Sequence, residues 1–362
     1  MNSRISKTTL IAWIYMLLLS SIAYSFELTP LPTKGEQLIA KKKYRILFRT
    51  TYPIIEFGLH NFSTPVHEAL TQLGHLCTDT IDDCTDVNLD FANTGIIAGV
   101  RWNDDPPFQF KTGEGRYSGC PTQNSPPATI SFALNTKCWY NHFKDVSAIA
   151  DSKPNTYSTG KGTLLARTHF GDLQFLHAMA LRTGVPPRET QEKLLMWAEF
   201  TWRVQSKNRD YLPPGTRIGA VPIPKFQEHF PKNEERTIEY LFTVGRPWLR
   251  LQIEDVAFGS LLHMIEDSFA GGHVSRARVS DGTCSVPAIV EFHTYAGQPK
   301  AAHKEHDNLE HARTKVALID VLKEIVKRRY ERQSWADVRP YLENCVFQVA
   351  VDARKSSATV GD

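Results

Sequence analysis

The segment LLHMIEDSFAGGHV, residues 261–274, constrains the fold most, because it places ionisable side chains within an apolar, helix-like run. His263 and Asp267 are four residues apart, so on a helix they project from one face, one turn apart. His273 comes ten residues after His263, which is about 280° further around an ideal helix. The Gly271-Gly272 pair before it can end the helix in a left-handed turn. We therefore expect the chain to fold back there and to bring His273 to the same cavity.

These three residues allow two interpretations. An imidazole and a carboxylate on one helix face can bind a single metal ion, or they can form a buried hydrogen bond beside an ordinary helix end. The chain contains 13 histidines, and several others stand near aspartate or glutamate. The wider pattern favours the metal-binding hypothesis over the structural one.

Residues 1–25 have the features of a secretory signal peptide. Arg4 and Lys7 precede an apolar run, and the small residues at Ala23–Ser25 suit cleavage before Phe26. An uncleaved membrane anchor is the alternative. Removal of this segment takes away two basic residues and no acidic ones, so the net charge falls from +3 to +1. A nearly neutral protein has no overall field that attracts nucleic acid, and we expect a secreted, soluble monomer without a stable nucleic-acid partner.

The sequence has six cysteines. An even number in an exported chain indicates disulfides, and the lack of a C-x2-C pair argues against a zinc site built from thiolates. The sequence leaves the pairing open, and our hypothesis is that neighbours pair in order, as Cys77–Cys84, Cys120–Cys138 and Cys284–Cys345. A zinc site in this chain must then consist of histidines and carboxylates.

Apolar residues at helical spacing predict a mainly α, compact multi-helix fold, with residues 26–362 as a single domain and its core over about 60–352. Residues 78–165 are rich in Asp, Asn, Gly, Pro and Thr, so we expect a long excursion of disulfide-bearing loops there. Residues 213–231 form a proline-rich connection. Helices are expected over residues 64–77, 169–183, 187–206, 233–243, 247–270, 299–330 and 334–352.

Other candidate ligands are spread along the chain. Each is more often structural when taken alone, but together they favour a site with several metal ions. They are His67 in TPVHEAL, Asp104 and Asp105 in RWNDDPP, and His169, Asp172 and His177 in THFGDLQFLHAMA.

Residues 297–313 add two interleaved pairs with i, i+4 spacing, His303 with Asp307 and His306 with Glu310. The two pairs lie on different faces of a helix, so only one pair can face a given cavity.

Taken in order, these motifs resemble those of the zinc-dependent phospholipase C / P1 nuclease superfamily, and most closely the larger secreted bacterial phospholipases C. The resemblance runs over roughly residues 60–310, through short motifs separated by long insertions. It implies an all-helical domain around a zinc cluster, with H-x3-D-x5-H as the central metal helix. It also implies that the aspartate of WND is both a ligand and a catalytic base. The implied zinc ligands are His67, Asp104, His169, His263, Asp267, His273, His303 and Asp307.

One departure from the family concerns the N-terminus. Family members use an N-terminal tryptophan as a zinc ligand, whereas the expected mature N-terminus here is Phe26. A side chain such as His60 can take its place, so we expect two or three Zn2+ ions.

The resemblance implies a secreted phospholipase C that acts at a membrane surface. Such an enzyme uses metal-activated water to cleave the glycerol-side phosphodiester of phospholipids such as phosphatidylcholine, giving diacylglycerol and a phosphorylated head group. A P1-type single-strand nuclease and a non-enzymatic secreted metal-binding protein are the alternatives.

Overall fold

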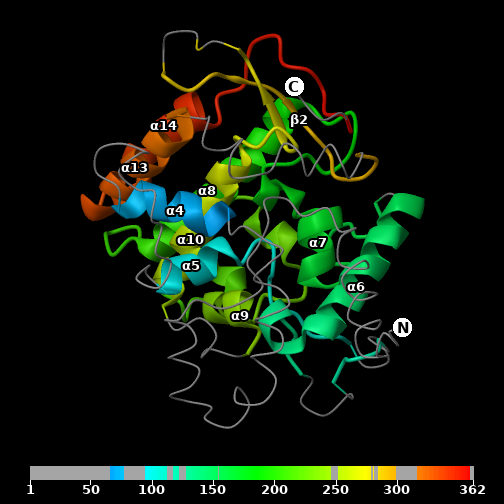
Figure 1. Cartoon of the computed structure of the whole chain (residues 1–362). Helices are drawn as coiled ribbons and strands as arrows, with labels where there is room; N and C mark the ends of the chain where they lie inside the picture. Colours follow the sequence, from blue (N-terminus) through cyan, green and yellow to red (C-terminus); the bar gives the residue numbers. More distant parts are fainter. Residues whose placement is uncertain are drawn as a thin grey trace, which may run out of the picture.

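The computed structural model describes residues 66–76, 94–111, 117–121, 128–153, 155–245, 252–278, 280, 284–298 and 316–358. Helices dominate these residues and sheet is sparse, which confirms the mainly α prediction. The helices surround α10 (Ile253–Asp267), which carries the H-x3-D motif (Figure 1). Several predictions fall outside the described residues: the signal peptide, His60, Cys77, Cys84, His303, His306, Asp307 and Glu310.

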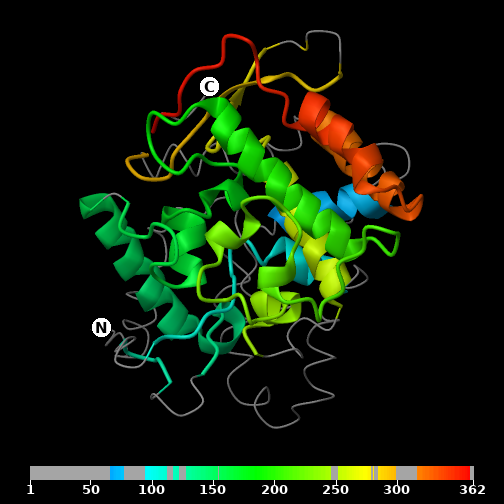
Figure 2. The ribbon, with the colours of Figure 1, turned by 180° about the vertical axis from the view of Figure 1, so that it is seen from behind.

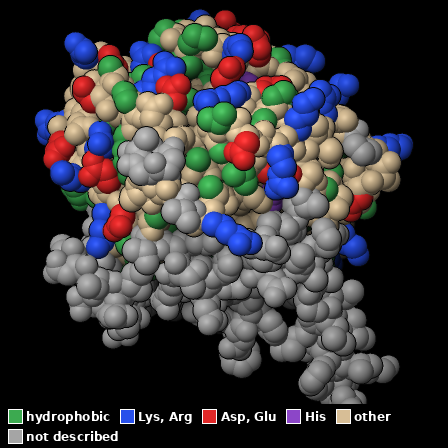
Figure 3. Space-filling view, turned by 90° about the horizontal axis from the view of Figure 1, so that it is seen from above, with side chains coloured by type: hydrophobic (Ala, Val, Ile, Leu, Met, Phe, Trp, Pro, Cys, Tyr) green, Lys and Arg blue, Asp and Glu red, His purple; other side chains and the backbone are tan. Residues whose placement is uncertain are grey.

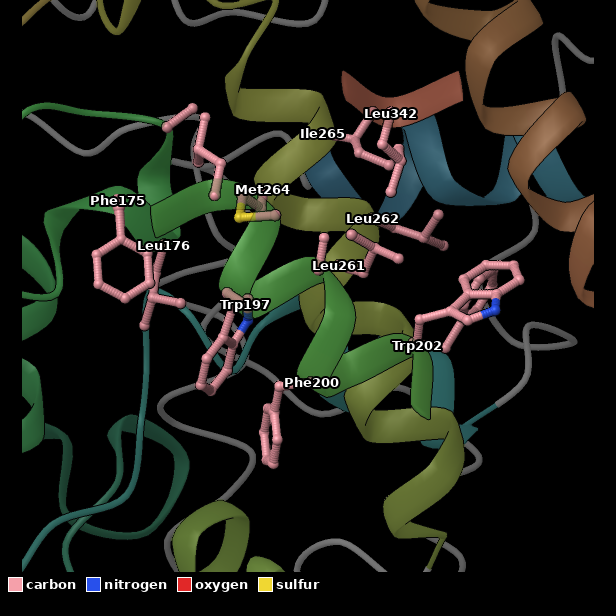
Figure 4. Close-up of a cluster of buried hydrophobic side chains, with 14 of the residues drawn as sticks. Phe175, Leu176, Trp197, Phe200, Trp202, Leu261, Leu262, Met264, Ile265 and Leu342 are labelled. Carbon is pink, nitrogen blue, oxygen red and sulfur yellow. The ribbon is translucent and has the colours of Figure 1, made fainter. Parts of the chain in front are cut away.

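Helix α8 (Pro187–Gln205) lies across α10, and the two helices form the centre of the core (Figure 2). Its first residue is proline, whose missing N–H is unneeded in a first turn, and its bounds confirm the helix predicted over 187–206. Trp197 of α8 is fully buried, and its Nε1 donates a hydrogen bond to Ser260 Oγ of α10 at 3.1 Å. Figure 4 labels the side chains where these helices meet their neighbours: Phe175, Leu176, Trp197, Phe200, Trp202, Leu261, Leu262, Met264, Ile265 and Leu342.

Helix α5 (Thr94–Val100) lies so close to α10 that only glycine fits at the contact. A Cβ on Gly99 would come within 2.1 Å of the Val256 carbonyl oxygen, and a Cβ on Gly259 within 2.1 Å of the Ile96 carbonyl oxygen. Both distances are far inside van der Waals contact, so the two glycines set the separation of the helices. The chain that leaves α5 therefore starts directly beside α10.

Helices α4 (Val66–Leu76), α13 (Val316–Tyr330) and α14 (Trp335–Tyr341) cover one side of this centre (Figure 1). Helix α4 contacts α5, α10 and α13, while α14 contacts α8. These helices, together with α9 (Ile238–Thr243), occupy the positions predicted for them, and α9 and α14 are shorter than expected. Residues 299–315, the expected first half of the α13 helix, lie outside the described residues.

The prediction of long loops over residues 78–165 is wrong for two segments. Thr94–Val100 forms α5, and Phe132–Ser152 forms α6, a helix of 21 residues. The polar composition hides α6, and Asn135 interrupts its first turns with non-helical backbone angles (φ −140°, ψ 50°). Its buried apolar residues nevertheless recur at helical spacing; they are Cys138, Trp139, Phe143, Val146 and Ala150.

The helix predicted over residues 169–183 is instead two short pieces, α7 (Leu164–Phe170) and the 3-10 helix η3 (Gln174–His177). Gly171 separates them, and a Cβ there would come within 2.1 Å of the Tyr157 carbonyl oxygen. Helix α7 packs against α6 and shares a second hydrophobic cluster with it. This cluster lies beside the main core on the side away from α13 (Figure 1).

Among the described residues two disulfides are present, Cys120–Cys138 and Cys284–Cys345, and they confirm two of the three predicted pairs. The second joins the chain before β2 (Ile289–Phe292) to a π-helical turn that follows α14. Strand β2 pairs antiparallel with β1 (Val274–Arg276). Disulfides are typical of extracellular proteins.

The surface seen from above carries Lys and Arg side chains interspersed with Asp and Glu (Figure 3). Within the described part of the chain, no helix combines the length and the apolar character needed to cross a membrane.

Candidate metal centre

Helix α10 contributes the first two side chains of a buried cluster. His263 and Asp267 project from the same face, as the i, i+4 spacing predicts, and His263 Nε2 lies 3.0 Å from Asp267 Oδ2. Every residue of α10 except two near its start is buried. Ionisable groups in a helix this deeply buried require compensating partners.

The turn after α10 differs from the prediction. The helix ends at Asp267, before the glycines, and neither Gly271 nor Gly272 has a positive φ. The chain instead makes successive tight turns, in which the His273 amide donates to the Ala270 carbonyl at 3.0 Å. The fold-back still takes place, because His273 Nδ1 lies 3.5 Å from Asp267 Oδ2.

Arg276 holds this turn in place. Its side chain is half-buried, and loss of contact with water lowers the pKa of its guanidinium to about 9. Nε donates to the Ser268 carbonyl at 2.8 Å, and the Nη atoms donate to the Pro287 and Val346 carbonyls, each at 2.8 Å. The guanidinium carbon also lies 4.1 Å from the centre of the Phe269 ring. One cation therefore joins the end of α10, the β-hairpin and the turn after α14.

Helix α4 supplies His67, which completes a first group of three possible ligands. His67 Nε2 lies 3.4 Å from Asp267 Oδ1. The His67 ring stacks on the His263 ring, with centroids 3.9 Å apart and an interplanar angle of 25°. One ligand atom from each of His67, His263 and Asp267 lies within 4.8 Å of the others.

A second group of three consists of Asp104, His169 and His177. Asp104 follows α5, His169 is in α7, and His177 ends η3. Asp104 Oδ1 lies 3.8 Å from His169 Nε2 and 3.7 Å from His177 Nδ1. All three side chains are at least 95% buried, with residue exposures of 3%, 4% and 2%.

The two groups adjoin one another. His177 Nδ1 lies 2.9 Å from Asp267 Oδ2 and 3.1 Å from His263 Nε2. Asp104 Oδ2 lies 3.8 Å from His263 Nδ1 and 4.0 Å from His67 Nε2. The cluster can therefore hold metal ions side by side, with Asp267 and Asp104 at the boundary between the two groups.

The outer nitrogens of three rings donate to backbone carbonyls. His263 Nδ1 donates to Val100 at 2.6 Å, His169 Nδ1 to Leu165 at 3.0 Å, and His177 Nε2 to Asn103 at 3.2 Å. Histidines that bind metal usually donate their other N–H in this way, which fixes the orientation of the ring. In each case the second nitrogen faces the carboxylates of the cluster.

Burial and neighbouring charges act in opposite directions in the cluster; at His263 the carboxylates of Asp267 and Asp104 outweigh burial and raise the pKa to about 9. Burial lowers the pKa of His169 and of His177 to about 4, so both rings are neutral, as ligands must be, at neutral pH. Burial also raises the pKa of Asp104 to about 6, against the opposing effect of the nearby histidines. Asp267 differs, because the surrounding histidines overcome burial and keep the pKa of its carboxyl well below the usual value.

Four buried carboxyl groups lie near His67. One of them, Glu68, is paired with Arg101, with 2.7 Å between Oε1 and Nε. The others are Asp104, Glu266 and Asp267, each no more than 3% exposed. Among the described residues, Asp104 Oδ2 is buried without a hydrogen-bond donor. A cation at this point would satisfy it.

The structure brings together six of the eight ligands that the sequence predicts. His273 lies at the edge of the cluster, where its Nδ1 donates to the His177 carbonyl at 2.6 Å. Asp105 takes a structural role instead, since its carboxylate accepts the backbone amide of Phe132 at 3.0 Å and begins α6. The predicted ligands His303 and Asp307, like their alternatives, lie outside the described residues.

His177 is the residue that the sequence-based ligand set omits. It comes eight residues after His169, so one continuous helix would separate the two by more than two turns, about 12 Å along its axis. The break at Gly171 removes that objection, because α7 and η3 are separate pieces there and the His169 and His177 rings lie with their centroids 4.9 Å apart. Gly171 in HFGD could have been interpreted as a helix break, and that interpretation would have indicated His177 as a ligand.

Comparison of the chain with protein-family models, with curated proteins and with solved structures gave no match. The geometry of the cluster is therefore the basis for any functional assignment.

Proposed function

We propose that this protein is a secreted, zinc-dependent phosphodiester hydrolase of the phospholipase C type. One observation carries the proposal: two groups of buried histidines and carboxylates adjoin each other, joined by the 2.9 Å contact of His177 Nδ1 with Asp267 Oδ2. Adjacent metal ions are a recurring solution for phosphodiester cleavage, because one ion alone stabilises the attacking or the leaving oxygen less completely.

The donor set fits zinc. Imidazole nitrogens and carboxylate oxygens are ordinary zinc ligands, and three protein ligands to an ion leave a position for water or substrate. In this proposal His67, His263 and Asp267 hold one ion, and Asp104, His169 and His177 hold the other. Two observations support this assignment. Asp104 Oδ2 is buried and accepts no hydrogen bond from the described residues, and the outer nitrogens of three rings donate to backbone carbonyls.

The bound zinc ions would supply Lewis acidity, lowering the pKa of water and neutralising charge on the phosphate. Asp104, at the boundary of the two groups, would orient the attacking water and accept its proton. The water oxygen forms a new bond to phosphorus, and the bond from phosphorus to the glycerol oxygen breaks. The glycerol oxygen takes up the proton that Asp104 accepted and leaves as diacylglycerol, while the phosphorylated head group is the second product.

Phospholipid is the proposed substrate because the chain after residue 25 is nearly neutral. A nuclease needs a positively charged groove that follows the backbone of the nucleic acid. The face in Figure 3 instead carries both signs of charge. The disulfides are in keeping with action outside the cell.

The test uses purified protein from residue 26 onward, with bound metal measured by mass spectrometry. Expected are about two zinc ions per chain and release of diacylglycerol from phosphatidylcholine vesicles, both lost in His263→Ala. His229→Ala is the matched control, since His229 is partly buried but lies outside the cluster. Nucleotide release from single-stranded DNA without lipid hydrolysis would establish a nuclease instead. Bound metal without either activity would establish a metal-binding protein.

A further inference from the structure

Glu266 precedes Asp267 in α10 and belongs to neither group of ligands, yet it is fully buried. Its Oε2 lies 2.7 Å from His67 Nδ1, and its Oε1 accepts a hydrogen bond from Thr71 Oγ1 at 2.7 Å. Both carboxylate oxygens are therefore engaged by side chains of α4. A buried carboxylate is retained in a protein only when such partners satisfy it.

The spacing of these residues explains how one carboxylate reaches both partners. His67 and Thr71 are four residues apart in α4, so they lie on one face of that helix, which is turned toward α10. Glu266 and Asp267 are consecutive and point about 100° apart around α10. As a result, Glu266 contacts the Nδ1 edge of the His67 ring, and Asp267 Oδ1 lies 3.4 Å from its Nε2 edge.

His67 differs from the other ring ligands in how its outer nitrogen is held. Backbone carbonyls hold the outer nitrogens of His169, His177 and His263. A side-chain carboxylate holds that of His67. The orientation of the three other rings follows from the path of the backbone, whereas the orientation of His67 depends on the identity of residue 266.

We propose that Glu266 is a positioning residue, which together with Thr71 fixes the His67 ring so that Nε2 is presented to the metal centre. The inference rests on the metal centre of the proposed function, but not on the identity of the substrate. Stacking on His263 fixes the plane of the His67 ring, and Glu266 fixes its rotation within that plane. Loss of such an outer partner typically weakens metal binding by about 10- to 100-fold.

The competing explanation is that Glu266 only ties α4 to α10. The two roles differ in what a substitution changes. A purely structural tie would lower the free energy of unfolding of the metal-free protein and leave the metal affinity of the folded protein unchanged. A positioning role changes the affinity and the coordination geometry of one metal ion, even where the metal-free protein remains equally stable.

The experiment compares Glu266→Gln with Glu291→Gln. Glu291 is also buried and also accepts a hydrogen bond from a hydroxyl, that of Ser357, but it lies on β2. Zinc affinity is measured by competition with a chromophoric chelator, and the visible spectrum of the cobalt-substituted protein reports coordination. Urea unfolding of the metal-free proteins is the third measurement.

For Glu266→Gln we expect the affinity for one of the two zinc ions to fall about 10- to 100-fold, with an altered cobalt spectrum. Glu291→Gln should bind both ions as the wild type does. Thr71→Val, which removes only the second hydrogen bond, should weaken the same ion by a smaller factor, and Thr71→Ser should restore it. If Glu266→Gln does not fold, the two Thr71 variants decide the question in its place.

The positioning role would be overturned if Glu266→Gln binds zinc with wild-type affinity and has an unchanged cobalt spectrum. If Glu266→Gln does not fold, the same result in Thr71→Val would overturn it. A wild-type protein that binds two zinc ions but cleaves no phosphodiester would refute the proposed function and leave the role of Glu266 measurable. A wild-type protein that binds no metal would refute both.

Discussion

His263 Nδ1 donates a hydrogen bond of 2.6 Å to the carbonyl oxygen of Val100, although 163 residues separate the two in the sequence. Val100 is the last residue of α5, where the helix leaves carbonyls without a partner inside the helix. The bond therefore satisfies a helix terminus and at the same time turns His263 Nε2 toward Asp267. The end of α5 therefore orients a ligand of the helix against which it packs, α10.

Gly259 makes this bond possible, and its replacement by alanine should disturb the metal centre. The new Cβ would lie 2.1 Å from the Ile96 carbonyl oxygen and 2.6 Å from the Val100 amide nitrogen, so α5 and α10 must separate. Overpacking of this kind costs about 1–3 kcal/mol of unfolding free energy. We expect that loss in urea unfolding, together with weaker zinc binding, because Val100 moves away from His263.

Gly215→Ala is the matched control for this substitution. A Cβ at Gly215 meets nothing within 4 Å, and the residue has no positive φ. Its stability and zinc affinity should equal those of the wild type. Equal behaviour of Gly259→Ala and Gly215→Ala would show that the contact of α5 with α10 does not position the cluster.

Arg276 should be essential for the turn between Asp267 and His273. Arg276→Met would leave the carbonyls of Ser268 and Val346, both fully buried residues, and of the partly buried Pro287 without this donor. Buried acceptors that lose a donor cost roughly 1–3 kcal/mol each, so we expect a loss of about 3 kcal/mol or more in unfolding free energy. Arg276→Lys should recover only part of it, because an ammonium group cannot reproduce the planar fork of donors.

The control for Arg276 is Arg217→Met, which breaks a surface ion pair with Glu235. The side chain of Arg217 is 65% exposed and that of Glu235 is 81% exposed. Such pairs contribute little to stability, and the unfolding free energy should stay the same. A loss in Arg276→Met no larger than in Arg217→Met would mean that the turn is held by its backbone hydrogen bonds alone.

Local periodicity was sufficient to predict part of the cluster. His263 and Asp267 lie one turn apart on a helix, and this relationship depends on nothing beyond α10 itself. The short motifs around His67, Asp104 and His169 indicated further ligands, which the structure brings to the same place. In these cases the residue type and its immediate neighbours carry the information.

Other relationships depend on tertiary packing and left no local signal. Glu266 and His67 are 199 residues apart, and only the crossing of α4 with α10 brings them together. The turn after Asp267 was predicted to use the two glycines, but the hydrogen bonds of Arg276 hold it in another conformation. Helix α6 was missed because polar residues stand between the apolar residues that it buries, and two of its polar side chains, His142 and Ser147, are themselves buried.

Asp172 should make the stability of the protein depend on pH in the acid range. Burial alone would raise the pKa of Asp172, but hydrogen bonds from Arg167 and His229 outweigh burial and lower it. A carboxyl with a lowered pKa stabilises the folded state above its unfolded pKa of about 3.9. That contribution disappears as the pH falls through the lower, folded-state pKa.

We therefore expect Asp172→Asn to lose about 3 kcal/mol of unfolding free energy at pH 7, as removal of one partner from a buried pair does. The difference from the wild type should shrink as the pH is lowered below about 4. Urea unfolding between pH 7 and pH 2 measures it. A constant difference over this range would show that the Asp172 carboxyl has the same pKa in the folded and unfolded states.

Removal of metal should destabilise the wild type and leave Asp267→Asn nearly unaffected. Asp267 lies within 3.5 Å of His67, His177, His263 and His273, so its carboxylate serves both groups of ligands. An ion that binds only the folded protein stabilises it by about 4 kcal/mol when free zinc exceeds the dissociation constant 1,000-fold. Thermal unfolding with zinc and with a chelator should therefore differ strongly in the wild type and in Glu291→Gln.

An amide at residue 267 is a poorer zinc ligand than a carboxylate, so Asp267→Asn should gain little stability from zinc. If zinc stabilises Asp267→Asn as much as the wild type, the ion is bound elsewhere and the two groups of buried ligands are not its site.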